Sequence, residues 1–293
     1  MPQSENHDSE SPKPFLRWAG GKRKLVPEIL KRFPVDYKPN KNLFFEPFVG
    51  GGSLMLALGS EASEFYVPGE RLVINDANPD LICTYKVLRD DPSKLIKELE
   101  KLQNRITKID YEKIRASNPK NELQKAARFI YLNKTCFNGL WRVNAKGEFN
   151  VPWGKIKKPN IVDKTNYFLV SNRLQKAKIL NVDYKKAVST AKKGDLVYFD
   201  PPYIPLSPTA SFSAYAKNGF GIPDQQELAN LIGKLTSKGV YVILSNSNTD
   251  LTRKIYGKYL NFNTIEVRRS ISAKSDGRIK VLEVIGSNER KIK

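Results

Sequence analysis

Residues 42–59 read NLFFEPFVGGGSLMLALG and contain the clearest change of local structure in the chain. Asn42 to Glu46 predicts a short buried strand, Val49 to Ser53 a glycine-rich turn, and Leu54 to Leu58 the start of a helix. Glycines allow a tight turn and let a ligand approach the backbone closely, although no phosphate-binding Gly-Lys-Ser/Thr follows. The stretch therefore predicts the first strand–turn–helix unit of an α/β domain, and its turn is either a ligand site or only a tight connection.

The same alternation returns along the chain. Further strands are predicted at Arg71 to Asp76, Lys178 to Val182, Asp195 to Asp200 and Val240 to Ser245, and helices at Lys24 to Arg32, Asn78 to Leu88 and Asp224 to Lys238. Asp224 is the predicted cap of the last helix. Thr264 to Arg269 and Lys280 to Ile285 predict a closing antiparallel pair. Together these elements predict an open, Rossmann-like α/β sheet.

Residues 90–166 depart from this pattern and predict an insertion in the sheet domain. Apolar residues recur there at helical spacing, at Leu95, Leu99, Leu102 and Ile106, and a second helix is predicted from Glu122 to Leu132. Trp141 to Asn144 and Glu148 to Val151 flank Ala145-Lys146-Gly147, which predicts a β-hairpin. The insertion is therefore mainly helical and carries one hairpin.

The charge of the chain points to a polyanionic partner. Lys and Arg number 50 and Asp and Glu 30 in 293 residues, so the formal net charge is +20. Nucleic acid is the first candidate, because a basic protein attracts phosphates. An anionic membrane is the second, but no basic amphipathic helix is evident. The remaining alternative is a basic surface without a special partner.

The cysteines and the single histidine exclude other classes of protein. Cys83 and Cys136 do not indicate a disulfide framework, and with only His7 they do not support a zinc site, so we expect no metal. Both cysteines are interpreted as small buried apolar residues. The polar start, MPQSENHDSESPKP, lacks an apolar signal region. We therefore expect a cytoplasmic protein with a disordered tail at residues 1–13.

The sharpest chemical signal is the stretch from Leu196 to Tyr203, an apolar strand that ends in Asp-Pro-Pro-Tyr. The prolines stiffen the chain and lack N–H groups, so nearby carbonyls remain available as acceptors. The carboxylate of Asp200 and one such carbonyl can hold both hydrogens of an exocyclic amino group, and Tyr203 offers a face for stacking. The alternative is a rigid turn with a capping aspartate. The spacing from the glycine-rich turn favours the chemical interpretation.

Asp76 ends the second predicted strand. An acid at this position can accept hydrogen bonds from the hydroxyls of a ribose. The alternative is a cap for the helix predicted from Asn78. The sequence leaves both interpretations of Asp76 open.

Four motifs resemble, in the same order, those of the Dam-type (D12 class, alpha group) DNA adenine-N6 methyltransferases. They are Phe15 to Lys22, Glu46 to Ser53, Asn138 to Asn144 with Gly147 to Pro152, and Asp200 to Tyr203. The resemblance covers essentially the whole chain after the tail. It implies a Rossmann-like S-adenosylmethionine-dependent methyltransferase sheet at 14–89 and 167–293, and a target-recognition domain at 90–166.

The resemblance also implies the reaction and its residues. The methyl group of S-adenosylmethionine would pass directly, in line, to the amino nitrogen of an adenine flipped out of duplex DNA, usually within GATC. Asp200 and the Pro201 carbonyl would bind the amino group, with Pro202 beside them and Tyr203 stacked on the base. The implied cofactor-binding residues are Trp18, Lys22, Phe48, Gly50, Gly52, Asp76, Asp183 and Asp200. For Asp183 a turn or cap is an equal alternative.

The DNA contacts implied by the resemblance come mostly from the insertion. The residues are Arg17, Phe137, Asn138, Leu140, Arg142, Pro152 and Ser207. Arg142 can make a bidentate contact with guanine and Asn138 can read a base edge. Lys134, Lys155, Lys157 and Lys158 would contact phosphates or only form a solvated basic face. The segment from Ile204 to Gly221 is predicted to be mobile without DNA, and Ser207 and Tyr215 would contact DNA once it orders.

Four alternatives to this function remain. Amino methyltransferases also act on cytosine N4, on RNA or on protein glutamine, and an inactive relative would bind DNA only. A cytosine-C5 enzyme is disfavoured, because neither Cys83 nor Cys136 follows a proline in a loop. We expect a monomer in solution that acts on double-stranded DNA, either alone or with a restriction endonuclease that shares its target without binding it.

Overall fold

A computed structural model of the protein describes residues 11–18, 20–60, 63–205, 220–268 and 280–289. The chain forms two compact units. We call Met1–Gly21, Gly50–Glu70 and Asn78–Ile179 the helical unit, and Lys22–Val49, Arg71–Ala77 and Leu180–Lys293 the sheet unit. These boundaries follow packing and differ from the functional division at 90–166, because helices on both sides of that segment pack with it. The target-recognition domain at 90–166 stays a prediction.

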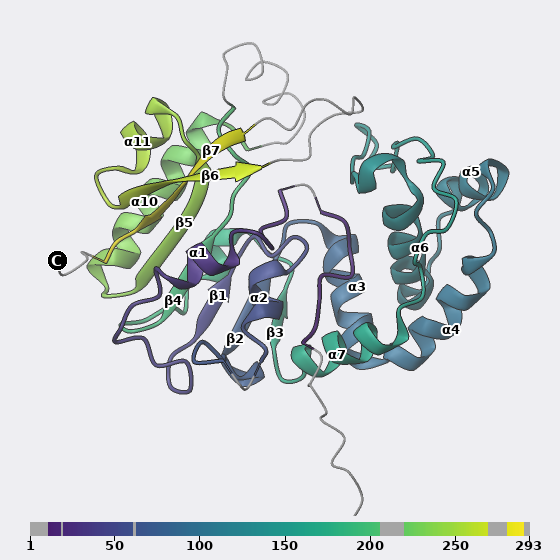
Figure 1. Ribbon diagram of the computed structural model, residues 1–293, viewed down its shortest axis with the longest axis horizontal. Helices are drawn as coiled ribbons and strands as arrows, with labels where there is room; N and C mark the ends of the chain where they lie inside the picture. The colour runs from purple at the N-terminus through teal and green to yellow at the C-terminus, as the bar shows by residue number, and fades with distance from the viewer. Residues whose placement is uncertain (1–10, 19, 61–62, 206–219, 269–279, 290–293) are drawn as a thin grey trace, which may run out of the picture. The chain divides into compact units, whose positions relative to one another are not determined.

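Within the described residues, the sheet has seven strands in the order β3-β2-β1-β4-β5-β7-β6 (Figure 1). Their bounds are β1 Phe44–Glu46, β2 Leu72–Asn75, β3 Lys178–Leu180, β4 Leu196–Phe199, β5 Tyr241–Ser247, β6 Asn261–Arg268 and β7 Lys280–Ser287. The pairs β1–β2, β1–β4 and β4–β5 are parallel, whereas β7 runs antiparallel to β5 and β6. The predicted open α/β sheet and its closing antiparallel pair are therefore confirmed.

The strand order reverses between β1 and β4. From β1 the chain adds β2 on one side, whereas β4 and β5 lie on the other. At such a switch point the carboxyl ends of neighbouring parallel strands diverge and leave room for a ligand. The residues that follow these two strands are Pro47 and Asp200. The topology thus places both sequence motifs of the sheet unit at the same edge.

The helices of the sheet unit cover an apolar core. They are α1 Val26–Leu30, α8 Tyr184–Ala187, α10 Ile222–Ser237 and α11 Asp250–Tyr256. Phe45, Val197 and Val242 of the sheet cluster with Leu228 of α10 and Tyr256 of α11, because successive strand residues face opposite sides and every second one reaches this core. In the described ranges, no helix is both long and apolar enough to cross a lipid bilayer.

The predicted cap of α10 is wrong. Gly221, not Asp224, precedes the helix, and Asp224 lies at its third position. The carboxylate of Asp224 accepts the N–H of Gly221 at 2.6 Å. An acid in the first turn binds free N–H groups and complements the helix dipole, which gives it the same sequence signal as a cap.

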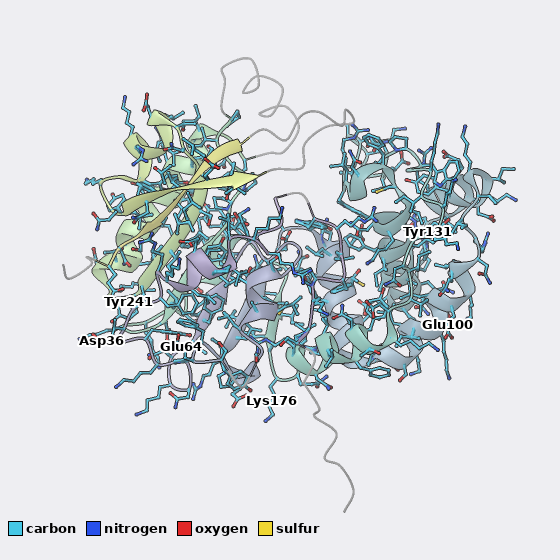
Figure 2. The ribbon with its side chains drawn as sticks, viewed as in Figure 1. Asp36, Glu64, Glu100, Tyr131, Lys176 and Tyr241 are labelled. Carbon is cyan, nitrogen blue, oxygen red and sulfur yellow. The ribbon has the colours of Figure 1, made fainter. Side chains whose placement is uncertain are left out.

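The helical unit consists of α2 Ser53–Ala57, α3 Pro79–Asp90, α4 Pro92–Gln103, α5 Lys108–Ala116, α6 Glu122–Thr135 and α7 Lys164–Leu174, with short 3₁₀ turns η1 Gly69–Arg71, at the unit boundary, and η2 Phe137–Gly139. Side chains of Asn78, Asp91, Thr107, Asn121 and Asp163 cap α3 to α7 in turn. Asn78 is thus the side-chain cap of α3. Tyr131 of α6, labelled in Figure 2, is fully buried and donates to the carbonyl of Arg105.

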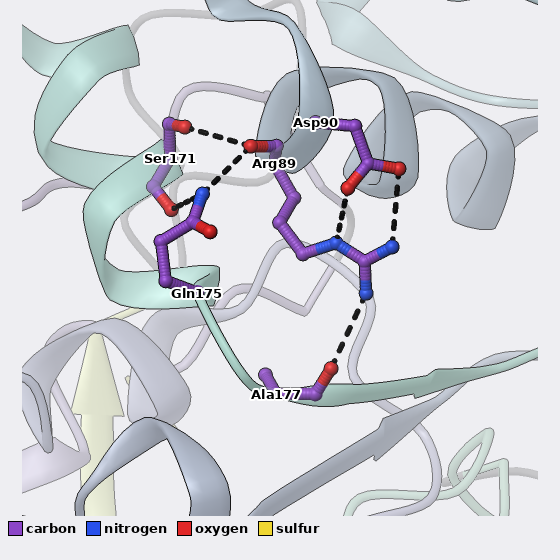
Figure 3. Close-up of polar contacts among 5 residues, drawn as sticks. All are labelled: Arg89, Asp90, Ser171, Gln175 and Ala177. Atoms are coloured by element: carbon purple, nitrogen blue, oxygen red, sulfur yellow. Dashed lines mark hydrogen bonds and ion pairs between the residues drawn. The ribbon is translucent and has the colours of Figure 1, made fainter.

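Hydrogen bonds join the end of α3 to α7 (Figure 3). The carbonyl of Arg89 in the last turn of α3 accepts from Ser171 Oγ at 3.0 Å and from Gln175 Nε2 at 2.8 Å. The Arg89 guanidinium donates to the carbonyl of Ala177 at 3.3 Å. The carbonyls at a helix end need such partners, and these bonds fix α7, which the sequence did not predict, beside α3.

The predicted hairpin is confirmed in a shorter form. Val143 and Phe149 form an antiparallel bridge, the N–H of Asn144 donates to the carbonyl of Glu148 at 2.9 Å, and the N–H of Asn150 donates to that of Arg142 at 3.0 Å. The predicted strands, Trp141 to Asn144 and Glu148 to Val151, are longer than this ladder. The side chain of Asn144 accepts the N–H groups of Lys146 and Glu148 at 3.0 and 2.9 Å. Asparagine satisfies backbone donors locally in this way and thereby competes with a strand ladder.

Candidate active site

Asp200 directly follows β4 and lies against Lys22. The Lys22 Nζ is 3.0 Å from Asp200 Oδ2. The other carboxylate oxygen, Oδ1, is buried and has no hydrogen-bond partner among the described residues. Burial raises the pKa of the Asp200 carboxyl, although the Lys22 charge lowers it. Asp200 therefore presents one buried oxygen that can accept a hydrogen bond from a ligand.

The carbonyls of Pro201 and Pro202 differ in their hydrogen bonding. Gln225 Nε2 of α10 donates to the carbonyl of Pro202 at 2.7 Å. In the described part of the chain, no hydrogen bond reaches the buried carbonyl of Pro201. Gln225 is itself held, because its Oε1 accepts from Tyr256 at 2.5 Å and from Asn246 at 3.3 Å. The carbonyl of Pro201 and Oδ1 of Asp200 are thus two open acceptors on consecutive residues.

Tyr203 is held by its hydroxyl and by its ring. The hydroxyl donates to Glu283 Oε2 of β7 at 2.9 Å, and burial raises the pKa of Tyr203, so that the hydroxyl stays protonated. The Lys22 Nζ lies 4.6 Å from the centre of the ring. The side chains of Lys22, Asp200 and Tyr203, predicted separately, therefore form one cluster in the sheet unit.

Asn75 shapes the neighbouring strand ends. Its Nδ2 donates to the carbonyl of Pro47 at 3.0 Å, and its Oδ1 accepts the N–H of Val182 at 2.9 Å. One buried amide thereby fixes the turns that follow β1 and β3 beside the end of β2. The next residue, Asp76, is partly exposed, and its carbonyl accepts from Asn181 at 2.8 Å. Its proposed bond to a ribose stays a prediction.

Phe48 and Asp183 lie near α8. The ring of Phe48 packs on Tyr184 at 5.3 Å and on Phe220 at 5.7 Å between centres, and it remains partly exposed. The side chain of Asp183 caps α8 by accepting the N–H of Lys185 at 2.8 Å. The alternative cap role of Asp183 is thus observed, whereas its cofactor role stays a prediction.

In the helical unit, Trp18 explains the glycine-rich turn. A Cβ added to Gly50 would lie 2.7 Å from Trp18 Cδ1, and one added to Gly51 would lie 2.9 Å from Trp18 Cβ. Gly50 and Gly52 also have positive φ angles of 48° and 69°. Tyr85 donates to the carbonyl of Gly50 at 2.9 Å. The glycines therefore have a packing reason of their own, and their contact with a cofactor stays a prediction.

Trp18 also begins a row of aromatic rings in the helical unit. It stacks on Phe129 at 6.2 Å, Phe129 packs on Trp141 at 4.0 Å, and Trp141 packs on Phe149 at 4.6 Å between centres. Aromatic pairs at these separations stabilise packing beyond the area that they bury. The row holds the segment around Trp141 against α6, which explains why Trp141 does not extend a strand.

The predicted DNA-contacting side chains of the helical unit are mostly exposed. Phe137 is 42% and Leu140 40% exposed, and Asn138 has a positive φ of 54°. Arg142 donates to Asn150 Oδ1 at 2.7 Å. Of the other predicted members of the set, Lys134 is partly buried. The exposed ones are Arg17, Pro152, Lys155, Lys157 and Lys158. Ser207 and Tyr215 lie outside the described residues.

Asn133 of α6 organises this segment. Its side chain exchanges two hydrogen bonds with the backbone of Arg17, at 2.8 and 2.7 Å, and donates to the carbonyl of Gly139 at 3.2 Å. A Cβ at Gly139 would lie 2.3 Å from Arg17 Cβ. The N-terminal motif and the turn after α6 are therefore fixed to each other by one buried amide.

The sequence analysis missed four of these positioning residues: Asn75, Asn133, Gln225 and Glu283. Each is a buried polar side chain inside an otherwise apolar element, as in the strand sequence VLEVI around Glu283. Buried polar groups of this kind are nearly always hydrogen-bonded. A search for polar residues within predicted core strands and helices would have found them.

The prediction that both cysteines are buried is confirmed for one of them. Cys136 is buried, but Cys83 is partly exposed. Over the described ranges, no group of three His, Cys, Asp or Glu side chains is arranged to hold a metal ion. The site therefore consists of carboxylates, amides, aromatic rings and one lysine.

Comparison with known proteins assigns the chain to a family. Residues 18–271 match the model of the D12 class N6 adenine-specific DNA methyltransferases. A type II methyltransferase of Lactococcus lactis subsp. cremoris, M1.LlaDCHI, is 42% identical over 94% of this chain and 95% of its own. M.MjaIII of Methanocaldococcus jannaschii is 41% identical over 91% and 95%, and a DNA adenine methylase of Haemophilus influenzae 37% over 93% and 92%. The chain therefore belongs to the D12 class N6 adenine-specific DNA methyltransferase family, whose members use S-adenosylmethionine to methylate adenine in DNA.

Proposed function

We propose that the protein methylates the adenine of GATC in duplex DNA, after flipping that base out of the helix and by direct in-line transfer. The observation that carries the proposal is the pair of open acceptors, Asp200 Oδ1 and the Pro201 carbonyl. An adenine amino group has two N–H donors, and two acceptors on adjacent residues match them. An amino group inside a duplex is paired and stacked, so the base must leave the stack to reach them.

The two acceptors also direct the reaction. Hydrogen bonds to both N–H groups orient the amino nitrogen so that its lone pair faces the incoming methyl group. The nitrogen–carbon bond forms as the carbon–sulfur bond breaks, and the sulfur keeps the bonding electron pair. The nitrogen then loses one proton, for which the Asp200 carboxylate is a hydrogen-bonded acceptor. S-adenosylmethionine supplies an activated methyl group, so the protein's contribution is mainly position and electrostatics.

We propose Trp18, Lys22, Phe48, Gly50, Gly52, Asp76, Asp183 and Asp200 as the residues that contact S-adenosylmethionine. Two features support the set within the sheet unit. The partly exposed ring of Phe48 offers a face for stacking, and Asp76 follows a strand at the edge where such sheets bind ligands. Lys22 already has a carboxylate partner in Asp200, so its contribution to binding includes keeping that carboxylate in place.

We propose that the segment 90–166 recognises the target sequence, with Arg17, Phe137, Asn138, Leu140, Arg142, Pro152 and Ser207 as DNA contacts. Exposure of Phe137 and Leu140 supports this role, since large apolar side chains at the surface often mark an interface. The Arg142 guanidinium is held by Asn150, which reduces the freedom that the side chain loses on binding. The proposed reader of guanine is Arg142.

The proposal is tested by methyl transfer from labelled S-adenosylmethionine to two duplexes that differ only in GATC or GTAC. We expect label on the first duplex alone, recovered as N6-methyladenine, and none with Asp200→Ala. Label on both duplexes would retain the adenine chemistry and overturn the target. Label on cytosine or on RNA would replace the substrate, and tight DNA binding with no transfer to any substrate would identify an inactive binding protein.

We further propose that the protein is a monomer that acts in the cytoplasm, with no partner other than DNA. A restriction endonuclease that shares the target would be functionally linked without being bound. Molecular mass in solution, measured with and without a GATC duplex, tests this proposal. A dimer in the absence of DNA would contradict it.

A further inference from the structure

We propose that Glu283 is a positioning residue for methyl transfer and that it acts through the hydroxyl of Tyr203. The inference rests on the proposed function, since it concerns the same site. Glu283 is only 3% exposed and lies in β7 between apolar neighbours. A carboxylate at such a depth needs hydrogen-bonded partners, and the Tyr203 hydroxyl donates to it at 2.9 Å.

The sheet holds Tyr203 from two adjacent strands. Glu283 of β7 is the register partner of Ser247 of β5. Ser247 Oγ donates to the carbonyl of Ile204 at 2.5 Å, and Asn246 Oδ1 accepts the N–H of Ile204 at 3.1 Å. One strand therefore fixes the backbone beside Tyr203, and the other fixes the far end of its ring.

The Tyr203 side chain acts on Asp200 directly, since it lowers the pKa of that carboxyl, and the orientation of its ring also reaches Asp200 through Lys22. The Lys22 Nζ lies 4.6 Å from the centre of the Tyr203 ring and 3.0 Å from Asp200 Oδ2. A cation is attracted to the face of an aromatic ring, so the position of the ring influences that of the ammonium group. The ammonium group in turn selects which carboxylate oxygen is occupied and which, Oδ1, stays open. Loss of the Glu283 anchor would loosen each of these contacts.

Glu283 also acts on Asp200 by charge. The groups that face this carboxylate or its neighbour Tyr198 are Lys22, Tyr203, Glu46 and Glu283. The negative charge of Glu283 raises the pKa of Asp200, and that of Lys22 lowers it. Glu283→Gln would therefore lower the pKa of Asp200 and move the acid limb of the rate profile to lower pH. A residue with only a packing role would leave this limb in place.

The test is a double-mutant cycle between Glu283→Ala and Tyr203→Phe, measured by single-turnover methyl transfer. We expect each single variant to lower the rate by roughly 10-fold, and the double variant to be no slower than the worse single, because both remove the same contact. The KM for DNA should change little. Glu283→Gln keeps an acceptor for the hydroxyl and should restore most of the rate. Glu266→Gln, an exposed residue of the neighbouring strand β6, is the matched control.

Losses that multiply in the double variant would overturn the inference, as would an unchanged acid limb in Glu283→Gln. If Glu283→Ala does not fold, the acid limb of the rate profile in Glu283→Gln decides the inference: a shift to lower pH supports it, and an unchanged limb overturns it. The same double-mutant cycle, measured as free energies of unfolding, gives the coupling energy between Glu283 and Tyr203 in the absence of substrate. A wild-type protein that methylates no substrate would refute the proposed function, whereas active wild type with independent losses would refute only the role of Glu283.

Discussion

The turn after β4 and the segment from Phe137 to Pro152 are held in opposite ways. In the turn, two buried side chains hold the residues that follow Asp200. Gln225 binds the carbonyl of Pro202, and Glu283 binds the hydroxyl of Tyr203. In the segment, the backbone is fixed by Asn133, while Phe137 and Leu140 remain exposed. Catalysis needs groups that are positioned before the substrate binds, whereas DNA recognition needs side chains that are exposed to solvent in the free protein. The difference predicts that variants of the turn lose rate and variants of the segment lose affinity.

The largest expected effect is that of Asp200→Ala. We expect kcat to fall by about 10³-fold, because the variant removes one of two acceptors for the amino group and leaves Lys22 without its partner. Affinity for GATC DNA, measured by fluorescence anisotropy, should change much less. Asp36→Ala, on an exposed aspartate of the same unit, serves as the control. Equal losses of rate and of DNA affinity would break the comparison.

Gln225→Ala should have the next largest effect on the turn. Its loss leaves the Pro202 carbonyl, Tyr256 and Asn246 without their shared partner. We expect the free energy of unfolding to fall by about 1–3 kcal/mol and kcat to fall by roughly 10-fold. Urea unfolding and single-turnover kinetics measure the two effects. If the free energy of unfolding falls as expected while kcat does not change, Gln225 does not position the turn.

Gly50→Ala tests the glycine-rich turn in the helical unit. The new Cβ would meet Trp18 at 2.7 Å, and the φ of 48° would strain any L-residue there. We expect a loss of about 1–3 kcal/mol in the free energy of unfolding. Combination with Trp18→Ala should restore part of this loss, since it removes the clash but not the strain. Additive losses in the double variant would contradict the packing reason for the glycine.

Arg142→Ala tests whether the segment from Phe137 to Pro152 recognises the target sequence. The side chain is exposed and, among the residues that the structure describes, bonds only to Asn150, so stability should change by less than about 0.5 kcal/mol. Discrimination between GATC and a site with the guanine replaced should fall by about 1–3 kcal/mol, which equilibrium competition binding would measure. Lys146→Ala, in the exposed turn nearby, should weaken binding to both sequences equally. Unchanged discrimination in Arg142→Ala would remove Arg142 as the reader.

The smallest expected effect is on the pH dependence. Burial raises the pKa of Asp200 above its ordinary value, so protonation begins to remove the acceptor at a higher pH than for an exposed aspartate. We expect the single-turnover rate to fall as the pH decreases through this raised pKa. The affinity for DNA at constant salt should not follow the same pKa. An acid limb at the ordinary aspartate value would show that Lys22 prevails over burial when substrate is bound.

Parts of the fold and site follow from local sequence. The alternation around Phe44 to Glu46 and Leu196 to Phe199 predicts the central strands, because buried parallel strands are short apolar runs. The Asp-Pro-Pro-Tyr tetrad likewise predicts where the reacting carboxylate lies. Local signals are weaker where side chains compete with the backbone. At Asn144 the predicted hairpin is shorter than expected, and at Asp224 an acid in the first turn resembles a cap.

By itself, the sequence determined the order of the sheet strands and of several helices, the motif residues and the family they resemble, since each depends on residues close together in the chain. Only the tertiary structure decided which oxygen of Asp200 stays open, that Gln225 occupies the Pro202 carbonyl, and that Glu283, 80 residues away, holds Tyr203. Pairing between strands that are distant in sequence sets these contacts. A buried hydrogen bond depends on the register of neighbouring strands, and no local pattern specifies that register.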